Sequence, residues 1–219
     1  MGNGSERITG RIQINRLHFP VSTLGYGQRI AVWVQGCSLA CPGCISLDTW
    51  EHGRGEISLS ALTAQLATWL AQADGLTVSG GEPFEQPKAL ANLLHWWRQN
   101  HTGDTLVFSG YSWEHLKQRH ADVLELIDVL VTDPYQAEAG HSMALRGSDN
   151  QRLHRLTALA NDRYSTLPSQ RALDLCWDGD RVWMAGIPHP DDLIQLHQKL
   201  RAQGLVFHSS DQPAVEVLP

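Results

Sequence analysis

Four short apolar runs separated by amphipathic segments constrain the fold of this 219-residue chain more than any other feature. The first run, residues 30–34, is apolar throughout, which is typical of a strand covered on both faces in a parallel sheet. Leucines and tryptophans then recur at helical spacing after Ser58 and after Pro87, and we expect Ser112 to cap a third helix. Strands that alternate with helices in this order predict an α/β fold with a parallel sheet. The other three runs are residues 76–78, 105–108 and 129–131.

Each of the four predicted strands ends in a glycine-rich or polar turn. In parallel α/β sheets, ligands bind beyond the carboxyl ends of the strands, so these turns predict a binding site. Ser109 and Asp133 are polar residues at neighbouring strand ends, where they either contact a ligand or serve in capping and turn formation. The turns are Gly36-Cys37, Ser79-Gly80-Gly81-Glu82, Ser109-Gly110-Tyr111 and Thr132-Asp133-Pro134.

The alternation of predicted strands and helices is less clear in the last third of the chain. Residues 171–184 predict a hairpin that turns at Asp178-Gly179, and residues 191–204 predict a short amphipathic helix. In that helix Leu193, Leu196 and Leu200 are expected to face inward, with Gly204 just past its end. We expect residues 1–155 to form the core and residues 156–219 an extension packed on it. Three roles stay open for the extension: docking a partner, covering the open side of the core, or forming an oligomer contact.

Composition excludes several classes of function. Apolar residues make up 42% of the chain and charged residues 18%, which is enough apolar material for a packed core. The net charge of −6 gives no basic surface for DNA or RNA. No apolar run approaches the roughly 18–20 residues that cross a bilayer, and residues 1–10 lack the apolar centre of a signal peptide. We therefore expect a cytoplasmic protein that binds neither nucleic acid nor membrane.

Three of the four cysteines, Cys37, Cys41 and Cys44, lie within eight residues directly after the first apolar run. An odd cluster of thiols in a cytosolic chain argues against a disulfide framework. A structural zinc site normally has four ligands, so Cys176 or one of the eleven histidines would have to complete it. Three thiolates suit a four-iron four-sulfur cluster in which one iron has no protein ligand and is free to bind a substrate. Zinc stays the less favoured alternative.

The spacing Cys-x3-Cys-x2-Cys after an apolar strand, with Ser79-Gly80-Gly81-Glu82-Pro83 at the end of the next strand, resembles the radical S-adenosylmethionine enzymes. The resemblance is greatest to the small activating enzymes, particularly those of anaerobic ribonucleotide reductase and other glycyl-radical enzymes. This chain departs from them at Gly43, where the wider superfamily is often aromatic, and at Ile45-Ser46, where the subgroup usually has Tyr-Asn. Neither position supplies a cluster ligand. The similarity covers about residues 11–155, through residues 25–29, 108–113, 128–131 and 146–152.

The resemblance implies a fold and a set of site residues. The implied fold is a partial (β/α) TIM-like barrel of about six parallel strands, followed by the C-terminal hairpin and helix. Cys37, Cys41 and Cys44 would hold a [4Fe-4S] cluster whose open iron binds S-adenosyl-L-methionine. No side chain is expected to be catalytic, since the cofactor carries the radical. The residues expected around S-adenosylmethionine are Gly43, Ile45, Ser79, Gly80, Gly81, Glu82, Ser109 and Asp133.

Some of these residues have individual expected roles. Glu82 could accept a hydrogen bond from the ammonium group of S-adenosylmethionine. Gly80 and Gly81 would let the backbone approach the ligand closely, since glycine has no Cβ, although a plain strand-to-helix turn is the alternative. Backbone atoms around Gly43 and Ile45 would contact the adenine.

The implied reaction is reductive cleavage of S-adenosylmethionine to a 5′-deoxyadenosyl radical that abstracts hydrogen from a target. The favoured target is a glycine of a partner glycyl-radical enzyme, with flavodoxin or ferredoxin as electron donor. The extension and the changed Ile45-Ser46 pair support an alternative, direct radical modification of a small molecule, nucleotide or peptide. A non-enzymatic zinc or cluster-binding module is the third and least favoured interpretation.

Overall fold

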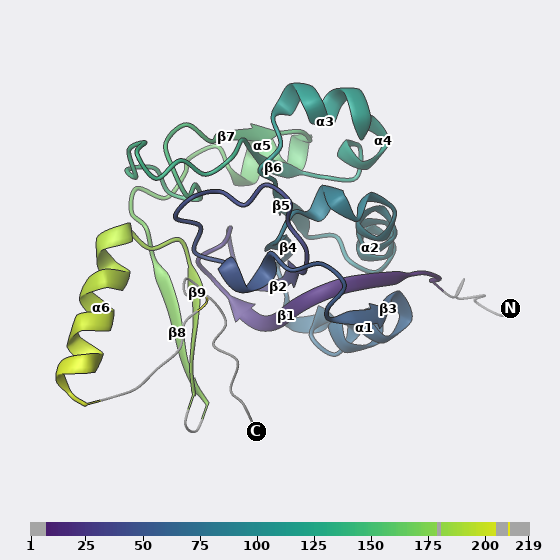
Figure 1. Ribbon diagram of the computed structural model, residues 1–219. Helices are drawn as coiled ribbons and strands as arrows, with labels where there is room; N and C mark the ends of the chain where they lie inside the picture. Colours follow the sequence, from purple (N-terminus) through teal and green to yellow (C-terminus); the bar gives the residue numbers. More distant parts are fainter. Residues whose placement is uncertain (1–7, 179–180, 205–209, 211–219) are drawn as a thin grey trace, which may run out of the picture.

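The computed structural model describes residues 8–178, 181–204 and 210, and these residues form a mixed α/β fold (Figure 1). The strands are β1 (Arg11–Val21), β2 (Arg29–Val34), β3 (Glu56–Ser58), β4 (Gly75–Gly80), β5 (Asp104–Phe108), β6 (Val129–Thr132), β7 (Arg152–Arg155), β8 (Leu173–Asp178) and β9 (Arg181–Gly186). The α-helices are α1 (Leu59–Ala67), α2 (Pro87–Asn100), α3 (Trp113–Arg119), α4 (Ala121–Leu124), α5 (Ala158–Arg163) and α6 (Pro190–Ala202).

Seven strands form one sheet in the order β3-β1-β2-β4-β5-β6-β7, and β8 and β9 form a separate hairpin. Strands β2, β4, β5 and β6 are mutually parallel, so all four apolar runs of the sequence form the parallel strands that they predict. The register places Val34 of β2 beside Gly80 of β4, which brings the ends of these two strands together. The turns that follow the parallel strands therefore meet at one edge of the sheet, as expected.

The expected barrel of about six parallel strands is not confirmed. Four strands are parallel, and β3 and β7 are the two edges of the sheet in the described part of the chain. β1 runs antiparallel to β2 because the short loop of residues 22–28 cannot make the long crossover that a parallel pair requires. β7 returns antiparallel to β6 after a connection without a helix. The sheet is thus parallel at its centre and antiparallel at both sides.

The side chains of β2 alternate between two differently covered faces of the sheet, because successive residues of a strand point in opposite directions. Ile30, Val32 and Val34 pack in the core with α1 and α2. Ala31 and Trp33 pack on the opposite face, in a cluster that includes Ala185 of β9. The sheet is therefore covered on both sides at β2, which explains why this strand is apolar throughout.

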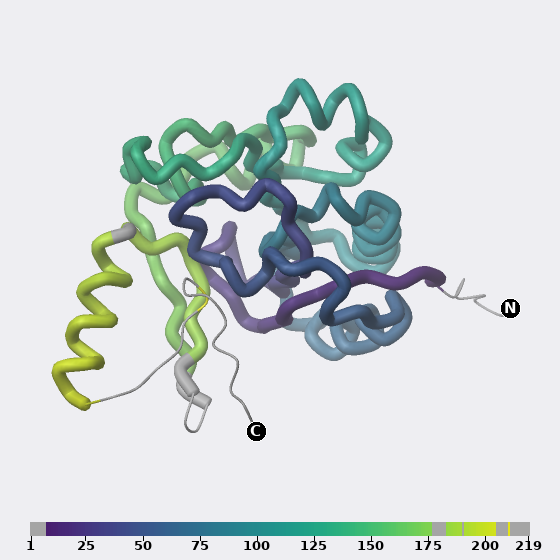
Figure 2. The backbone as a smooth tube through the Cα atoms, viewed as in Figure 1, coloured from purple at the N-terminus to yellow at the C-terminus, as the bar shows by residue number. Residues whose placement is uncertain are grey.

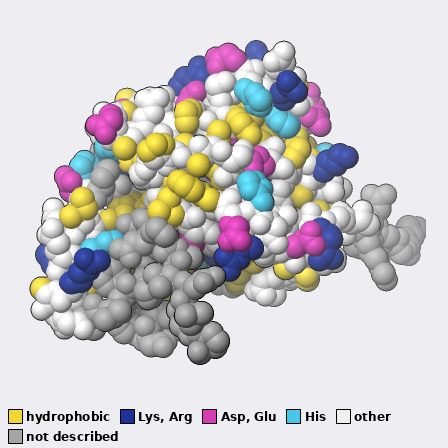
Figure 3. All heavy atoms as spheres, viewed as in Figure 1, with side chains coloured by type: hydrophobic (Ala, Val, Ile, Leu, Met, Phe, Trp, Pro, Cys, Tyr) yellow, Lys and Arg dark blue, Asp and Glu magenta, His cyan; other side chains and the backbone are white. Residues whose placement is uncertain are grey.

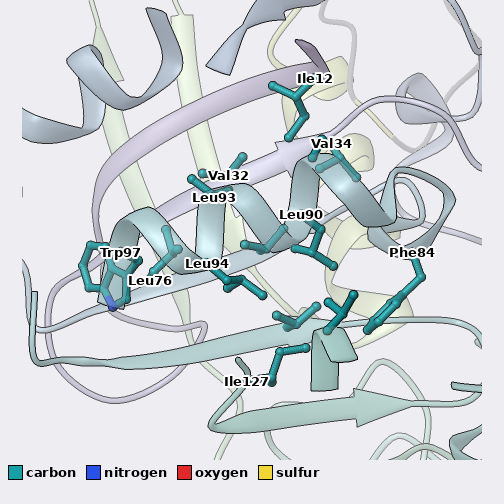
Figure 4. Packing of buried hydrophobic residues seen from close by; sticks show 14 of the residues in the cluster. Ile12, Val32, Val34, Leu76, Phe84, Leu90, Leu93, Leu94, Trp97 and Ile127 are labelled. Atoms are coloured by element: carbon teal, nitrogen blue, oxygen red, sulfur yellow. The ribbon is translucent and has the colours of Figure 1, made fainter. Parts of the chain in front are cut away.

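Helix α2 supplies much of the larger core (Figure 4). Leu90, Leu93, Leu94 and Trp97 recur at helical spacing and are each 0–1% exposed. Full burial of each such side chain contributes roughly 1.5–3 kcal/mol to folding. The helix begins at Pro87, as expected from a proline in the first turn.

Helices α1 and α3 also begin as the sequence predicts. The Ser58 hydroxyl accepts a hydrogen bond from the backbone N–H of Ala61, and the Ser112 hydroxyl accepts one from His115. These contacts satisfy N–H groups that the first turn of a helix leaves without an internal partner. The helical spacing after Ser58 continues to Trp69 and Leu70 in the sequence, but α1 ends at Ala67 and Leu70 lies in a separate 3-10 turn.

A buried ion pair fixes the amino-terminal ends of the parallel strands. Arg29 and Asp104 are both fully buried, with Nη2 of Arg29 3.0 Å from Oδ2 of Asp104. Arg29 also donates to the Thr77 hydroxyl at 2.6 Å, and the Tyr164 hydroxyl donates to Asp104 at 2.9 Å. A Cβ at Gly75 would lie 2.3 Å from Nη1 of Arg29, so only glycine fits there. Arg29, the last residue of the family-like segment 25–29, thus has a structural role at the end of the sheet away from the predicted site.

The C-terminal hairpin and α6 are present as predicted and lie on the other side of the molecule from α1 and α2 (Figure 2). Gly179 of the predicted turn lies outside the described residues. Gly204 follows α6 with φ +77°, the left-handed conformation expected past a helix end. The expectation that Leu196 faces inward is wrong, since it is 38% exposed and Leu193 is 9% exposed. Leu196 lies about 60° around the helix axis from Leu193, outside the narrow side of α6 that packs.

Among the described residues, no helix has the length and apolar character needed to cross a membrane.

Candidate functional site

A cavity of about 420 Å³ lies beyond the carboxyl ends of β2, β4 and β5. Its volume is within the range of roughly 300–1,000 Å³ that is usual for small-molecule and cofactor sites. Residues from the C-terminal hairpin and α6 complete its wall. The predicted site residues that line it are Cys37, Cys41, Gly43, Cys44, Ile45, Ser79, Gly80, Gly81, Glu82 and Ser109.

The three cysteines lie on one loop, residues 36–50, which we call the cysteine loop. Its base is closed by backbone hydrogen bonds from Gly36 N–H to the Thr49 carbonyl at 2.7 Å and from Cys37 N–H to the Trp50 carbonyl at 3.1 Å. A further bond from Cys44 N–H to the Cys41 carbonyl at 3.1 Å makes a tight turn between the last two cysteines. These bonds hold three half-buried thiols against the same cavity.

The environments of Cys37 and Cys41 favour the neutral thiols as long as no cation is near. Burial raises the pKa of Cys37 to about 11, although backbone N–H groups of Leu39 and Ala40 partly offset the effect. Burial also raises the pKa of Cys41, opposed by a backbone hydrogen bond from Tyr135. Metal binding needs thiolates, so bound iron would have to supply the positive charge that stabilises them. Ala40 has φ +45°, a rare conformation for a residue other than glycine and a typical feature of functional loops.

The three thiols that line the cavity are compatible with a multi-iron cluster. In the described part of the chain, no three His, Cys, Asp or Glu side chains converge on one point that a metal ion could occupy. A four-iron cluster makes no such demand, because each thiolate binds a different iron. Three thiols spread along the wall of one cavity are compatible with that arrangement.

Gly80 and Gly81 join the end of β4 to the cysteine loop. Gly81 donates to the Val34 carbonyl at 2.9 Å, and Glu82 N–H donates to the Gly36 carbonyl at 2.8 Å. A Cβ at Gly81 would lie 2.2 Å from the Gly36 oxygen, and one at Gly80 would lie 2.6 Å from the Val34 nitrogen. Gly80 also has φ +102°. The two glycines are therefore required by the close approach of β4 to the backbone that leads into the cysteine loop.

Glu82 lies at the base of the cavity and is 1% exposed. Its carboxylate accepts hydrogen bonds from the N–H groups of Phe84 at 3.0 Å and Gly110 at 2.7 Å, and from the Ser109 hydroxyl at 2.9 Å. Burial raises the pKa of Glu82 to about 7 in spite of these bonds. A cationic ligand in the cavity would favour the ionised carboxylate, so Glu82 is suited to pair with an ammonium group.

The structure places Asp133 apart from the other predicted site residues. It is not among the residues that line the cavity. Its carboxylate accepts a hydrogen bond from Nε of Arg152 at 2.7 Å and another from the Thr132 hydroxyl at 2.9 Å. Its carbonyl accepts a hydrogen bond from Gln151, which does line the cavity. The Asp133 carboxylate is therefore held by Thr132, the last residue of β6, and by Arg152.

Glu85 joins Ser38 of the cysteine loop to His52, a contact that the sequence did not predict. One carboxylate oxygen accepts a hydrogen bond from Ser38 N–H at 2.9 Å, and the other lies 2.7 Å from Nε2 of His52. Partial burial opposes ionisation of Glu85, but the hydrogen bonds from Ser38 and His52 leave its pKa lowered. Other cavity residues that the sequence did not single out include Tyr135, Ile187, Pro188 and Ile194, whose contacts depend on segments far apart in the chain.

The chain is similar to known proteins over its first two thirds. Residues 23–154 match the family described as "4Fe-4S single cluster domain". The anaerobic ribonucleoside-triphosphate reductase-activating protein of Enterobacteria phage T4 is 31% identical over 134 residues, covering 59% of this chain and 85% of the relative. The protein of the same name from Escherichia coli K12 is 31% identical over 148 residues, covering 64% and 96%.

Two more distant similarities complete the comparison. The pyruvate formate-lyase-activating enzyme of Clostridium pasteurianum is 30% identical over 116 residues, covering 50% of this chain and 48% of that enzyme. The crystal structure of QueE from Escherichia coli overlaps at a TM-score of 0.39 with 20% identity, covering 46% of this chain and 53% of QueE. A TM-score this low does not establish a shared fold.

The single-cluster domain and the activating enzymes among the relatives define the class of protein: a radical S-adenosylmethionine enzyme of the activating type. Within that class, the chain belongs to the family of the anaerobic ribonucleoside-triphosphate reductase-activating proteins. The family resemblance seen in the sequence is thereby confirmed. Its cofactors are a [4Fe-4S] cluster and S-adenosyl-L-methionine.

Proposed function

We propose that this protein cleaves S-adenosylmethionine reductively and uses the resulting radical to abstract hydrogen from a glycine of a partner glycyl-radical enzyme. Cys37, Cys41 and Cys44 would hold the cluster. The observation that carries the proposal is the placement of these three thiols and the buried Glu82 around one cavity. The relatives, which are named as activating proteins of a reductase and of a lyase, support the choice of target.

The chemistry supplied when both cofactors are bound is transfer of one electron to the sulfonium and cleavage of a carbon–sulfur bond, which yields methionine and a 5′-deoxyadenosyl radical. The hydrogen atom taken from the glycine Cα would end on the 5′ carbon, so that the products would be 5′-deoxyadenosine and a partner that carries the radical. The electron would come from an external donor of the flavodoxin or ferredoxin type.

The chain's own residues bind and shield the reactants in this proposal. Glu82 would accept a hydrogen bond from the ammonium group of S-adenosylmethionine at the base of the cavity. The Ser109 hydroxyl and the Gly110 N–H hold the Glu82 carboxylate in place. Ile45 and Trp50 of the cysteine loop give the cavity apolar walls. Such walls exclude water and competing hydrogen donors from a reactive radical.

We also propose that residues 1–155 carry this chemistry and that residues 156–219 form an extension of it. Asp133, which is held by Arg152, would act on the site through Gln151 rather than by touching S-adenosylmethionine.

The ligand set is tested by single cysteine variants. Cys37→Ala, Cys41→Ala and Cys44→Ala should each abolish the iron–sulfur absorbance and the formation of 5′-deoxyadenosine after anaerobic reconstitution. Cys176→Ala is the matched control, because Cys176 is exposed and outside the cavity. Loss of the cluster in the Cys176 variant would overturn the proposed ligand set.

A further inference from the structure

One wall of the cavity lies outside the region that matches the family. Gly186 of β9, Leu193 and Ile194 of α6, and the intervening Ile187 and Pro188 all line the cavity. The family match ends at residue 154. The alignments with two reductase-activating proteins cover 59% and 64% of this chain. We call these five lining residues the C-terminal wall, and all of them lie beyond the family match.

The hairpin that carries the C-terminal wall is fixed to the sheet by specific contacts. The Asp174 carboxylate of β8 accepts hydrogen bonds from the backbone N–H groups of Ser22 at 2.7 Å and Thr23 at 3.1 Å. The Trp183 ring of β9 stacks on His18 with ring centres 3.4 Å apart and meets Trp33 edge-on at 5.8 Å. These contacts connect the hairpin to β1, to β2 and to the loop between them.

Arg171 fixes the C-terminal wall at the cavity itself. Its guanidinium donates to the Pro188 carbonyl at 2.9 Å and, through its other terminal nitrogen, to the carbonyls of Arg146 at 2.9 Å and Gly147 at 3.2 Å. Gly147 and Pro188 both line the cavity. One side chain thus joins the C-terminal wall to the loop between β6 and β7, and the wall has a defined position in the site.

The C-terminal wall is apolar and extends from the cavity to the surface. Leu193 is 9% exposed and Ile194 is 54% exposed, although both line the cavity. The cysteine loop contributes Ile45 and Leu47 to the lining of the same cavity. Hydrophobic side chains also gather across the middle of this face of the molecule (Figure 3). Of the acidic and basic residues that the structure describes, Glu82 alone lines the cavity, at its base.

We propose that Leu193 and Ile194 select the target of hydrogen abstraction by contacting an uncharged, extended peptide segment on either side of the reacting glycine. This inference rests on the proposed function. A charged flanking residue would lose its hydration against Leu193 and Ile194, which carry no charge, so charged segments are disfavoured. Asp191 and Asp192 in the first turn of α6 would in addition repel an acidic segment. A peptide is favoured over a small molecule because the wall continues outward at Ile194, as a segment entering from a partner protein requires.

The test uses the full chain with its cluster reconstituted and S-adenosylmethionine bound, but without reductant, so that binding is measured without turnover. The probes are fluorescent ten-residue peptides with a central glycine flanked by valine and alanine, by aspartate, or by lysine. Wild-type protein should bind the apolar peptide at least about tenfold more tightly than either charged peptide, equivalent to about 1.4 kcal/mol.

Two variants separate the C-terminal wall from the rest of α6. Ile194→Glu should weaken binding of the apolar peptide about tenfold and improve binding of the lysine peptide, since the added carboxylate supplies a counter-charge. Leu196→Glu is the matched control, because Leu196 is an exposed leucine of the same helix that does not line the cavity. It should leave all three affinities unchanged.

Three results would overturn the inference: no binding of any peptide, equal affinity for all three, or equal weakening by Ile194→Glu and Leu196→Glu. A parallel assay with reductant and no peptide measures 5′-deoxyadenosine. Failure of that assay in wild-type protein contradicts the proposed function, whereas the peptide affinities test the C-terminal wall independently. Leu196→Glu, which changes a residue outside the cavity, should cleave S-adenosylmethionine at the wild-type rate in the absence of peptide.

Discussion

Replacing Gly80 by alanine tests how the sheet supports the cysteine loop. Two features make the substitution costly: Gly80 has φ +102°, and a Cβ there would lie 2.6 Å from the backbone nitrogen of Val34. Gly53 is the matched control, because it has φ +80° and a Cβ added to it would meet no atom within 4 Å. Both variants carry the conformational cost of a positive φ, and only the Gly80 variant also separates β4 from β2.

The size of the difference follows from the hydrogen bonds at the strand ends. The positive φ costs about 1 kcal/mol in each variant. Moving the end of β4 also weakens the bonds from Gly81 N–H to the Val34 carbonyl and from Glu82 N–H to the Gly36 carbonyl. At about 1 kcal/mol for each bond, Gly80→Ala should destabilise the protein by about 3 kcal/mol and Gly53→Ala by about 1 kcal/mol.

Thermal unfolding of the two variants measures this difference. For a domain of this size, 1 kcal/mol shifts Tm by roughly 2–4 °C, so we expect a decrease of about 6–12 °C for Gly80→Ala and about 2–4 °C for Gly53→Ala. The Gly80 variant should also take up less iron and sulfide, since the start of the cysteine loop is displaced. Equal destabilisation by the two substitutions would refute the idea that close approach of β4 positions the loop.

Three further predictions concern buried charges and the hairpin. The native pKa of Glu82 is about 7, above its usual 4.5, so its contribution to stability is fully present below pH 4.5 and is lost as pH rises through 7. The free energy of unfolding therefore falls by about 3 kcal/mol as the pH rises. Urea unfolding at pH 5 and pH 8 should show this decrease in wild-type protein and not in Glu82→Gln. Arg29→Met should lower the free energy of unfolding by about 3 kcal/mol, because Asp104 stays buried and keeps only Arg163, 2.8 Å away, as a cationic partner. Asp174→Ala should speed amide hydrogen exchange in β8 and β9 selectively.

Each of these predictions has a contrary outcome. A parallel pH dependence in wild-type protein and Glu82→Gln would show that Glu82 is not the group responsible. Arg11→Met is the control for Arg29, since the Arg11–Glu56 pair is exposed and should contribute less than about 1 kcal/mol. Equal losses in the two arginine variants would contradict the role of the buried pair. Unchanged exchange in Asp174→Ala would show that other contacts hold the hairpin.

Local patterns in the sequence were sufficient to predict the parallel centre of the sheet. Residues 30–34 are apolar at every position because they are covered on both faces, and the caps at Ser58 and Ser112 depend only on neighbouring residues. β1 was not predicted, because residues 11–21 mix polar and apolar side chains on a strand that is mostly half-buried. The expected number of parallel strands was wrong because pairing at the sheet edges depends on connections rather than on strand composition.

The sequence predicted those site residues that follow the ends of the parallel strands. Cys37, Glu82 and Ser109 follow parallel strands directly, so knowledge of the fold brings them together. Arg171 and Ile194 were not predicted as site residues. Their contribution depends on how the hairpin packs against a loop more than twenty residues away, which no local pattern encodes.

The most direct test of the central claim is to quantify the products formed by anaerobically reconstituted protein with S-adenosylmethionine and a strong reductant. Iron and sulfide analysis of the same sample establishes how much cluster is present. Protein with a full cluster should form 5′-deoxyadenosine and methionine in equal amounts, and Cys41→Ala should form neither. Absence of both products from wild-type protein with a full cluster would contradict the account.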